Sequence, residues 1–372
     1  MNLAFVVERP TQFEVPFYRH AAADPAHHLR ILYTDPRGAE PVYDPELGRT
    51  VSWGIDLLGG YDHAACPDFG ALKRELRRRR YDLVLVNGYT RRLYVLAAAL
   101  ARGAGIPVAL RLDSALFETP PPRALAKRLL FDLYLKRMYR LFLGVGSLTL
   151  DYLRFFGVPE ERTALFPYAV DVEAFRRGSA LAPAERAAAR ARLGIPDDAR
   201  ILLSVAKLNP REAPWDLLRA LDGDRWLLVA GDGPERAALE TFARERGLEK
   251  VRFLGYVPYP ELPALYAISD LFLHLAREER WGVSVQEALA CGLPVIASSR
   301  VGAARDLIEP GANGATYTAG DAAGLARRID EVLRLDPAAV REANRRILAG
   351  WDYPAAWRGL LRAAARVTGG SL

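Results

Sequence analysis

Short apolar segments alternate with helical segments along most of this chain, and that alternation limits its fold more than any other feature. In the first half, the apolar segments predict strands at residues 3–7, 29–33, 83–86, 108–111, 141–144 and 164–166. In the second half, they predict strands at residues 201–205, 226–230, 251–254, 271–275 and 294–297. Strands that alternate with helices in this way form parallel sheets covered by helices. The sequence therefore predicts an α/β protein with two doubly wound parallel sheets.

Residues 178–198 separate the two alternating patterns. This segment is rich in Ala and Arg and ends in a helix stop and a turn, Leu-Gly-Ile-Pro-Asp-Asp. We therefore expect one domain over residues 1–177, a linker over 178–198 and a second domain over 199–352. One more helix is predicted at residues 353–368.

Composition excludes several classes of protein. The 372 residues, 51% hydrophobic and 26% charged, suffice for two or three globular domains. No apolar run reaches the roughly 18 residues that span a bilayer. The N-terminus predicts a strand rather than a signal peptide, and two distant cysteines, Cys66 and Cys291, indicate neither a disulfide framework nor a zinc site. We expect a cytoplasmic protein whose net charge of +6 fits anionic ligands; no nucleic-acid-binding motif appears.

The most informative local pattern begins at Glu279 and reads Glu-Arg-Trp-Gly-Val-Ser-Val-Gln-Glu-Ala-Leu-Ala-Cys-Gly-Leu-Pro-Val. A predicted buried strand, 271–275, precedes it, and a helix over 283–291 ends before its Gly-Leu-Pro sequence. Glu279 is thus predicted in a loop at the carboxyl end of a strand, and Glu287 about one turn inside the next helix. Because open α/β sheets bind ligands at this edge, both carboxylates are predicted to face one crevice.

This pattern of two glutamates with seven residues and a glycine between them closely resembles the signature of family 4 glycosyltransferases. The resemblance covers nearly the whole chain: residues 231–234 are similar to the family's glycine turn, and 166–171 to its interdomain segment. Residues 43–45, 51–53 and 57–61 are similar to members from bacterial surface-polysaccharide clusters.

The resemblance implies the GT-B fold, in which two Rossmann-like domains face a cleft. The N-terminal domain would lie on the acceptor side, the C-terminal domain would bind a nucleotide-sugar donor, and the helix within 353–372 would return to the N-terminal domain. The family also implies chemistry without a bound metal ion or cofactor, and net retention at the anomeric carbon. In the same way, Glu279 is expected to face hydroxyls of the donor sugar, with Trp281 and Val257 beside the donor.

The start of the helix over 283–291 has the properties of a phosphate site. Sugar transfer from a nucleotide leaves positive charge on the sugar and negative charge on the diphosphate, and the protein must stabilise both. The amides around Gly282, Val283 and Ser284 open the helix and are well placed for phosphate oxygens. A carboxylate accepts two hydrogen bonds from a diol, so Glu287 is predicted to bind the ribose.

Basic residues follow the first strand of the second domain. Lys207 matches the family's basic residue that contacts the diphosphate. The family usually has a second basic residue five positions later, where this chain has Glu212, a reversal of charge. We predict that the adjacent Arg211 takes that role; the alternative is that Arg211 is solvated and diphosphate binding is weakened.

The first domain offers fewer candidates. Asp113 follows a predicted strand, at the edge where functional groups collect, and is expected to hold a sugar hydroxyl or to act as the acceptor's base. A helix cap or turn former is a nearly equal alternative. Thr11 and Gln12, after the first strand, are predicted to line the cleft.

Two features that resemble metal sites are better explained otherwise. Asp222-Gly223-Asp224 has the form of an Asp-x-Asp metal motif, but Asp-Gly is ordinary turn chemistry between a helix and a strand. His27, His28 and His274 have no partner at ligand spacing and are predicted to be structural. No metal site is expected.

Residues 123–140 predict an amphipathic basic helix, with six Lys or Arg side chains among leucines and aromatic residues and one acid, Asp132. Such a helix suits an anionic lipid surface, so peripheral contact with the inner face of the membrane is a hypothesis. The basic run at residues 73–80 is more simply a solvated helix end.

We therefore expect a retaining glycosyltransferase that moves a sugar from a nucleoside diphosphate to a glycan, lipid-linked or small-molecule acceptor. Two alternatives stay open at this point. A nucleotide-sugar epimerase on the same fold would need no acceptor, and a non-catalytic nucleotide-sugar-binding subunit would bind without turnover.

Overall fold

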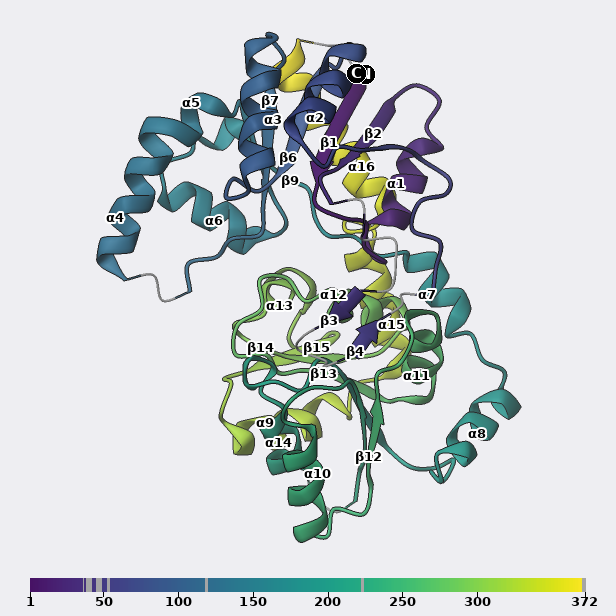
Figure 1. Cartoon of the computed structure of the whole chain (residues 1–372). Coiled ribbons are helices and arrows are strands. Elements are labelled where there is room, and N and C mark those ends of the chain that lie inside the picture. Colours follow the sequence, from purple (N-terminus) through teal and green to yellow (C-terminus); the bar gives the residue numbers. More distant parts are fainter. Residues whose placement is uncertain are drawn as a thin grey trace. The chain divides into compact units, whose positions relative to one another are not determined.

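The computed structural model describes residues 1–35, 37, 42–44, 49–51, 54–117, 120–221 and 224–369. Its contacts divide the chain into two compact units. Unit 1 comprises Met1–Glu40, Ile55–Val170 and Trp351–Leu372, and unit 2 comprises Pro41–Gly54 and Asp171–Gly350. Each unit is built on one parallel sheet, so the predicted α/β architecture with two such sheets is confirmed (Figure 1).

Unit 1 contains a seven-stranded sheet in the order β5-β2-β1-β6-β7-β8-β9, with every neighbouring pair parallel. Its strands are β1 (Asn2–Val7), β2 (His28–Tyr33), β5 (Asp62–Ala65), β6 (Leu83–Asn87), β7 (Val108–Leu112), β8 (Leu141–Gly144) and β9 (Thr163–Leu165). Its helices are α1 (Val15–Ala22), α2 (Phe69–Arg78), α3 (Arg92–Gly103), α4 (Pro121–Leu130), the π-helix η2 (Phe131–Leu135), α5 (Lys136–Met138), α6 (Ser147–Phe155), the 3₁₀ turn η3 (Glu160–Arg162) and α16 (Tyr353–Thr368). Four central strands, β1, β6, β7 and β8, are apolar and almost wholly buried, as expected of parallel strands with helices on both faces.

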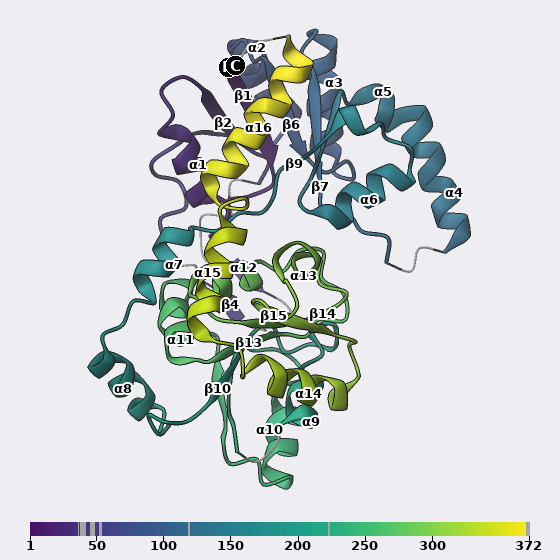
Figure 2. The same ribbon diagram turned by 180° about the vertical axis from the view of Figure 1, so that it is seen from behind.

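The last helix, α16, packs in unit 1 although it ends the chain. Asp352 caps it by accepting a hydrogen bond from the amide of Ala355 at 2.8 Å. Its Tyr353 and Trp357 rings pack edge-on against Phe17 of α1, and the Trp357 indole donates to Asp24 at 2.8 Å. Figure 2 shows α16, in yellow, lying along the strands of the unit 1 sheet.

Unit 2 contains a six-stranded parallel sheet in the order β12-β11-β10-β13-β14-β15. Its strands are β10 (Ile201–Val205), β11 (Trp226–Ala230), β12 (Val251–Gly255), β13 (Leu271–His274), β14 (Val295–Ser298) and β15 (Gly314–Tyr317), with a separate antiparallel pair, β3 (Val42–Asp44) and β4 (Arg49–Val51). Its helices are α7 (Val172–Gly178), α8 (Pro183–Arg192), η4 (Pro210–Glu212), α9 (Pro214–Ala220), α10 (Arg236–Glu245), η5 (Tyr259–Glu261), α11 (Leu262–Ile268), α12 (Val283–Ala290), α13 (Gly302–Leu307), α14 (Ala322–Val332) and α15 (Pro337–Leu348). Leucine, isoleucine and valine side chains from β10, β11, β13 and β14 form its buried core.

The strand order of each sheet reverses once. In unit 1 the chain builds outward on one side through β2 and β5, then returns to add β6 on the other side of β1. In unit 2 the reversal lies between β10 and β13. Ligands of open α/β sheets bind outside the carboxyl ends of the strands at such a reversal. The loops after β1 and β6, and those after β10 and β13, are therefore the places to look for function.

Two strands of the parallel sheets, β5 and β15, were not predicted from the sequence, and neither was the antiparallel pair β3 and β4. Strands β5 and β15 are edge strands of four residues, and β5 has no fully buried side chain, so neither shows the apolar run that marks the central strands. The segment 178–198, expected as a linker, contains α8, and the chain passes from unit 1 to unit 2 at Val170 and Asp171. Asp171 caps α7 there, accepting from the amide of Ala174 at 2.8 Å.

Within the described part of the chain, no helix combines the length and the apolar character needed to cross a membrane.

Candidate functional site

The reversal in unit 2 gathers residues that were singled out separately in the sequence. Lys207, Arg211 and Glu212 follow β10, while Glu279 and Gly282 follow β13, the strand paired with it. The two loops are joined by a backbone hydrogen bond of 2.7 Å from the amide of Arg277 to the carbonyl of Arg211. The topology therefore places both parts of the predicted donor site at one edge of one sheet.

The loop that carries Glu279 is fixed along its backbone. The Glu279 amide donates to the Arg300 carbonyl at 3.1 Å, and the Glu279 carbonyl accepts from the Gly302 amide at 2.9 Å. A Cβ at Gly302 would lie 2.1 Å from the carbonyl oxygen of Arg280, so the two loops pack without space for a side chain. The half-buried Glu279 carboxylate accepts a 3.4 Å hydrogen bond from the amide of Trp281. The first acid of the motif thus lies on a loop held by the neighbouring one.

Gly282 begins helix α12 in a left-handed conformation, with φ of +98°. A Cβ at this position would lie 2.9 Å from Cγ1 of Val301 and 3.2 Å from Nε2 of His274, so both the backbone angle and the space require glycine. The first amides of a helix have no partner within it, and those of Val283 and Ser284 open α12. The Trp281 side chain is buried in unit 2, at 2% exposure.

Glu287, the second acid, is buried to 4% exposure on α12. The Tyr266 hydroxyl on α11 donates a 3.0 Å hydrogen bond to its Oε2. Burial raises the pKa of the Glu287 carboxyl to about 7, although hydrogen bonds from Tyr266 and Tyr259 oppose that rise. The sequence placed this residue on the helix but gave no sign of the two tyrosines around it.

The basic residues lie on a tightly packed turn. Lys207 is half-buried, and its segment packs against the glycine turn after β11. The packing is close: a Cβ on Gly231 would lie 1.8 Å from the carbonyl oxygen of Ala206. The side chain of Asn209 accepts from the amides of Arg211 and Glu212 at 3.0 and 3.2 Å and so shapes η4.

Arg211 and Glu212 differ sharply in exposure. The Arg211 side chain is 56% exposed and forms a 2.9 Å ion pair with Glu212, which is 7% exposed. Glu212 therefore points inward, and Arg211 keeps its guanidinium accessible at the edge of the sheet. Val257, the other predicted donor residue, follows β12 and is half-buried.

His274, at the end of β13, lies in this site as well. It is 6% exposed, with its Nδ1 3.2 Å from the Ser284 hydroxyl. One ligand atom from each of Glu212, His274 and Glu279 lies within 4.8 Å of the other two. The sequence predicts a structural histidine because no partner stands at ligand spacing; the structure brings Glu279 from the following loop and Glu212 from η4, after the paired strand β10.

In unit 1 the predicted acceptor-side residues lie at the carboxyl edge of the sheet. The Thr11 hydroxyl accepts from the amide of Glu14 at 3.3 Å at the start of α1, and Gln12 beside it is half-buried. Asp113, half-buried after β7, accepts a 3.5 Å hydrogen bond from the Tyr168 hydroxyl.

A buried ion pair close to these residues was not predicted from the sequence. Arg111 is 3% exposed and bonds Glu14 at 2.6 Å and the carbonyls of Phe166 and Pro167 at 3.3 and 3.0 Å. Its guanidinium also lies 4.3 Å from the ring centroid of Tyr168, the partner of Asp113. An arginine inside an otherwise apolar strand was the available signal. Arg111 thus supports the segment that holds Asp113.

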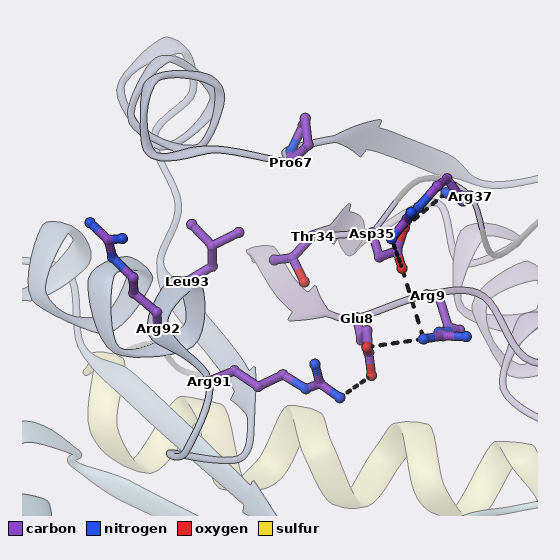
Figure 3. A pocket seen from close by; sticks show the side chains of 9 residues that line it. All are labelled: Glu8, Arg9, Thr34, Asp35, Arg37, Pro67, Arg91, Arg92 and Leu93. Carbon is purple, nitrogen blue, oxygen red and sulfur yellow. Dashed lines mark hydrogen bonds and ion pairs between the residues drawn. The ribbon is translucent and has the colours of Figure 1, made fainter.

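A cavity of about 760 Å³ opens at the same edge, past β1, β2, β5 and β6 (Figure 3). It is lined by Glu8, Arg9, Thr34, Asp35, Arg37, Pro67, Arg91, Arg92 and Leu93. Arg91 and Arg9 bond Glu8 at 2.5 and 3.2 Å, and Arg37 bonds Asp35 at 2.9 Å. The lining contains four arginine and two carboxylate side chains, which leaves the cavity net positive.

Some sequence-level features fall outside the described residues. These are Asp222 and Gly223 of the Asp-x-Asp motif, Pro45, Ser52 and Trp53, and with them the side chains of residues 43, 44 and 51.

Two family models match successive parts of the chain. The glycosyl transferase 4-like domain matches residues 18–169, and the glycosyl transferases group 1 domain matches residues 185–347. The first match covers most of unit 1 together with the Pro41–Gly54 segment of unit 2, and the second lies in unit 2. Together they cover both sheets.

Curated relatives share part of this chain. It is 35% identical to the D-inositol 3-phosphate glycosyltransferase of Thermobispora bispora over 229 residues, which is 55% of this chain and 51% of the relative. It is 30% identical to the protein of the same name from Mycobacterium tuberculosis over 270 residues, 70% of this chain and 51% of the relative. The chain thus spans about half the length of the curated relatives it matches.

Solved structures with the same fold match from end to end. Anabaena HepE in complex with UDP and glucose superposes with a TM-score of 0.73 at 18% identity, over 99% of this chain and 100% of that one. The sucrose-phosphate synthase of Thermosynechococcus elongatus superposes with a TM-score of 0.69 at 20% identity, over 100% of both chains. At these identities the likeness shows a shared fold.

Proposed function

Because the chain belongs to the glycosyltransferases of the GT-B fold, with a 4-like domain followed by a group 1 domain, we propose that it transfers a sugar from a nucleoside diphosphate to an acceptor. Unit 2 would bind the donor and unit 1 the acceptor. The observation that carries the proposal is the reversal between β10 and β13, where two basic side chains, the start of α12 and the first acid of the motif meet at one sheet edge.

Each group there has a task in the transfer. Lys207 and Arg211, with the first amides of α12, would neutralise the charge that grows on the diphosphate as the sugar leaves. Glu279, on its fixed loop, would accept hydrogen bonds from hydroxyls of the donor sugar. Glu287 would serve the ribose hydroxyls from within α12. The family resemblance supports transfer with net retention at the anomeric carbon.

UDP sugars are the first donors to test. Support comes from the HepE structures, which contain UDP, UDP-glucose, or UDP and glucose.

On the acceptor side, a glycan, a lipid-linked glycan or a small molecule with an anionic group fits unit 1. The net positive cavity of Figure 3 supports the anionic group, as do the curated relatives, which are named for a phosphorylated inositol. Asp113 would accept the proton of the attacking hydroxyl, with Thr11 and Gln12 beside it.

A lipid-linked acceptor would bring the protein to a membrane, and the segment 123–140 supports peripheral contact there. Leu125, Leu129 and Leu133 are 64%, 52% and 60% exposed, and they recur every four residues through α4 and η2. Figure 1 shows α4 at the outer side of unit 1, away from the strands. Exposed leucines next to basic side chains are suited to anionic lipid, so we propose contact with the inner face of the membrane.

The experiment measures nucleotide binding and turnover in turn. Thermal shift with UDP, GDP and ADP and their sugars identifies the donor, because a ligand raises apparent stability by mass action. Nucleotide release with that donor is then followed with and without inositol phosphate, glycan and lipid-linked acceptors. Release that depends on an acceptor supports transfer. Release without any acceptor indicates an epimerase or hydrolase, and binding without release indicates a non-catalytic subunit; either result rejects the proposal.

Lys207→Ala provides the test of the site. We expect it to lower turnover strongly, while Lys250→Ala, at the opposite end of the unit 2 sheet before β12, is the matched control. Equal activity in both variants would remove Lys207 from the site.

A further inference from the structure

Three ligand-bearing side chains converge beside the start of α12. Glu212 ends η4, His274 ends β13 and Glu279 lies in the following loop. One ligand atom from each lies within 4.8 Å of the other two. Two carboxylates and one imidazole at this spacing form a set that can enclose a cation.

The histidine adds an independent observation. His274 is 94% buried, its Nδ1 lies 3.2 Å from the Ser284 hydroxyl, and its Nε2 has no hydrogen-bond partner among the described residues. A buried ring nitrogen without a partner is uncommon and costs free energy, so its presence requires an explanation. A bound ligand supplies one.

The surrounding charges favour a cation over a protonated histidine. Burial lowers the pKa of His274, while Glu212 and Glu279 oppose that shift and Arg211 adds to it. When Nδ1 donates to the Ser284 hydroxyl, Nε2 carries the lone pair that a metal ion can use. Counting Arg211, which pairs with Glu212, the group carries two negative charges and one positive charge.

We propose that Glu212, His274 and Glu279 form a binding site for a divalent transition-metal cation of the Mn²⁺ type. Carboxylate oxygens and an imidazole nitrogen are ligands that such an ion accepts, whereas Mg²⁺ and Ca²⁺ prefer oxygen alone. Ser284 would hold the imidazole through Nδ1, as hydrogen-bonded groups beside metal sites commonly do. This assignment departs from the expectation that the site contains no metal.

A cation site would explain why position 212 is acidic in this chain. Where the resembling family has a second basic residue for the diphosphate, a cation held by this carboxylate would restore positive charge at the same edge of the sheet. This consequence rests on the proposed function, since it requires a diphosphate to bind there. The cation site itself does not.

Direct binding tests the proposal without any nucleotide. The full chain is dialysed against a chelator and titrated with MnCl₂, with bound Mn²⁺ followed by electron paramagnetic resonance. We expect one Mn²⁺ per chain, and affinity lower by roughly tenfold or more in Glu212→Gln and in His274→Asn. The matched control is Glu278→Gln, which removes an exposed carboxylate from the same loop and should bind Mn²⁺ normally.

Absence of stoichiometric Mn²⁺ binding by the wild-type chain would overturn the site, as would unchanged affinity in both variants. Thermal unfolding of each variant checks that it is folded. If either buried substitution prevents folding, Glu279→Gln, at a half-buried loop position, provides the same test of Mn²⁺ affinity.

A second titration separates this inference from the proposed function. UDP binding is measured with and without Mn²⁺. UDP binding by a chain that binds no Mn²⁺ would reject the cation site and leave the donor site standing. Stoichiometric Mn²⁺ binding by a chain that binds no nucleotide would support the cation site and reject the proposed donor.

Discussion

The hydroxyl of Tyr266 donates a 3.0 Å hydrogen bond to Oε2 of Glu287, and both side chains are buried. The second acid of the motif therefore has a partner inside unit 2 before any donor arrives. Burial nevertheless raises the pKa of the carboxyl to about 7, so the group is near half-protonation at neutral pH. A bound ligand that donates hydrogen bonds to this carboxyl would favour its charged form.

Stability should depend on pH through Glu287. Unfolded, this carboxyl titrates near 4.5; folded, near 7. Between those pH values the folded protein keeps a proton that the unfolded chain has lost, so the stability from this group is complete below pH 4.5 and is lost as the pH rises through 7. Over that range the wild-type chain should lose about 3 kcal/mol of unfolding free energy because of this group. The Glu287→Gln variant should not show that loss. Urea unfolding of both proteins from pH 4.5 to 8 measures it, and parallel pH profiles would contradict it.

Arg211 should contribute to donor binding, and its removal should also lower stability because it takes an ion pair from the buried Glu212 carboxylate. A guanidinium that bonds a phosphate contributes about 1.5–3 kcal/mol, so Arg211→Ala should raise the donor KM by roughly tenfold or more. The matched control, Arg328→Ala, removes an arginine paired with Glu331 on α14. A donor KM equal to that of wild type would remove Arg211 from the site.

Glycine should be required at position 282 for two separable reasons. Gly320 has a similar φ of +93°, and a methyl group there would have no other atom within 4 Å, so Gly320→Ala measures backbone strain alone, about 1–2 kcal/mol. Gly282→Ala adds contact with Val301 and His274 and should cost about 1–3 kcal/mol more. Chemical unfolding of the two variants gives the comparison. Equal losses would mean that the neighbours of Gly282 move aside freely.

Removal of Arg111 should destabilise unit 1 mainly through the partner it leaves behind. Arg111→Met strands the buried Glu14 carboxylate, at a cost of about 3–5 kcal/mol. Glu14→Leu in the same chain should recover only part, because the carbonyls of Phe166 and Pro167 still lose their donor. Unfolding of the two single variants and the double variant closes the cycle. Additive losses would show that the pair is not coupled.

The exposed leucines should matter for lipid and not for folding. Replacement of Leu125, Leu129 and Leu133 by Ser removes side chains that are more than half exposed, so the unfolding midpoint should change little. Flotation with anionic vesicles at low salt should fall by roughly tenfold or more, since each buried CH₂ contributes about 0.8 kcal/mol. Leu116→Ser, also exposed and outside the segment, is the control. Unchanged flotation would reject lipid contact through this helix.

Sequence periodicity predicted the central strands because they are buried on both faces and therefore mostly apolar. The ranges predicted for β8, β10 and β11 coincide with those in the structure. The edge strands β5 and β15 were missed because their sequences, Asp-His-Ala-Ala and Gly-Ala-Thr-Tyr, contain no continuous apolar run. The helix predicted over residues 123–140 is present but divided, with the π-helix η2 between α4 and α5. Residue spacing alone does not predict that break.

The site was predictable where its residues are neighbours in the sequence, and less so where the fold joins distant ones. Gly282 and the opening of α12 followed from local pattern. The contact of Glu212 with His274 and Glu279 depends on β10 pairing with β13, which no spacing in the sequence reveals. The same holds for Arg111, because its partner Glu14 lies 97 residues earlier in the sequence.

The two backbone bonds that join Glu279 to Arg300 and Gly302 have a consequence for selectivity. A sugar that reaches this loop meets main chain already in its final position, so little binding energy is spent on ordering it. A change in sugar preference would then come from substitutions of side chains on this fixed loop. The residues after β14 that hold the loop would tolerate fewer substitutions than the residues that contact the sugar.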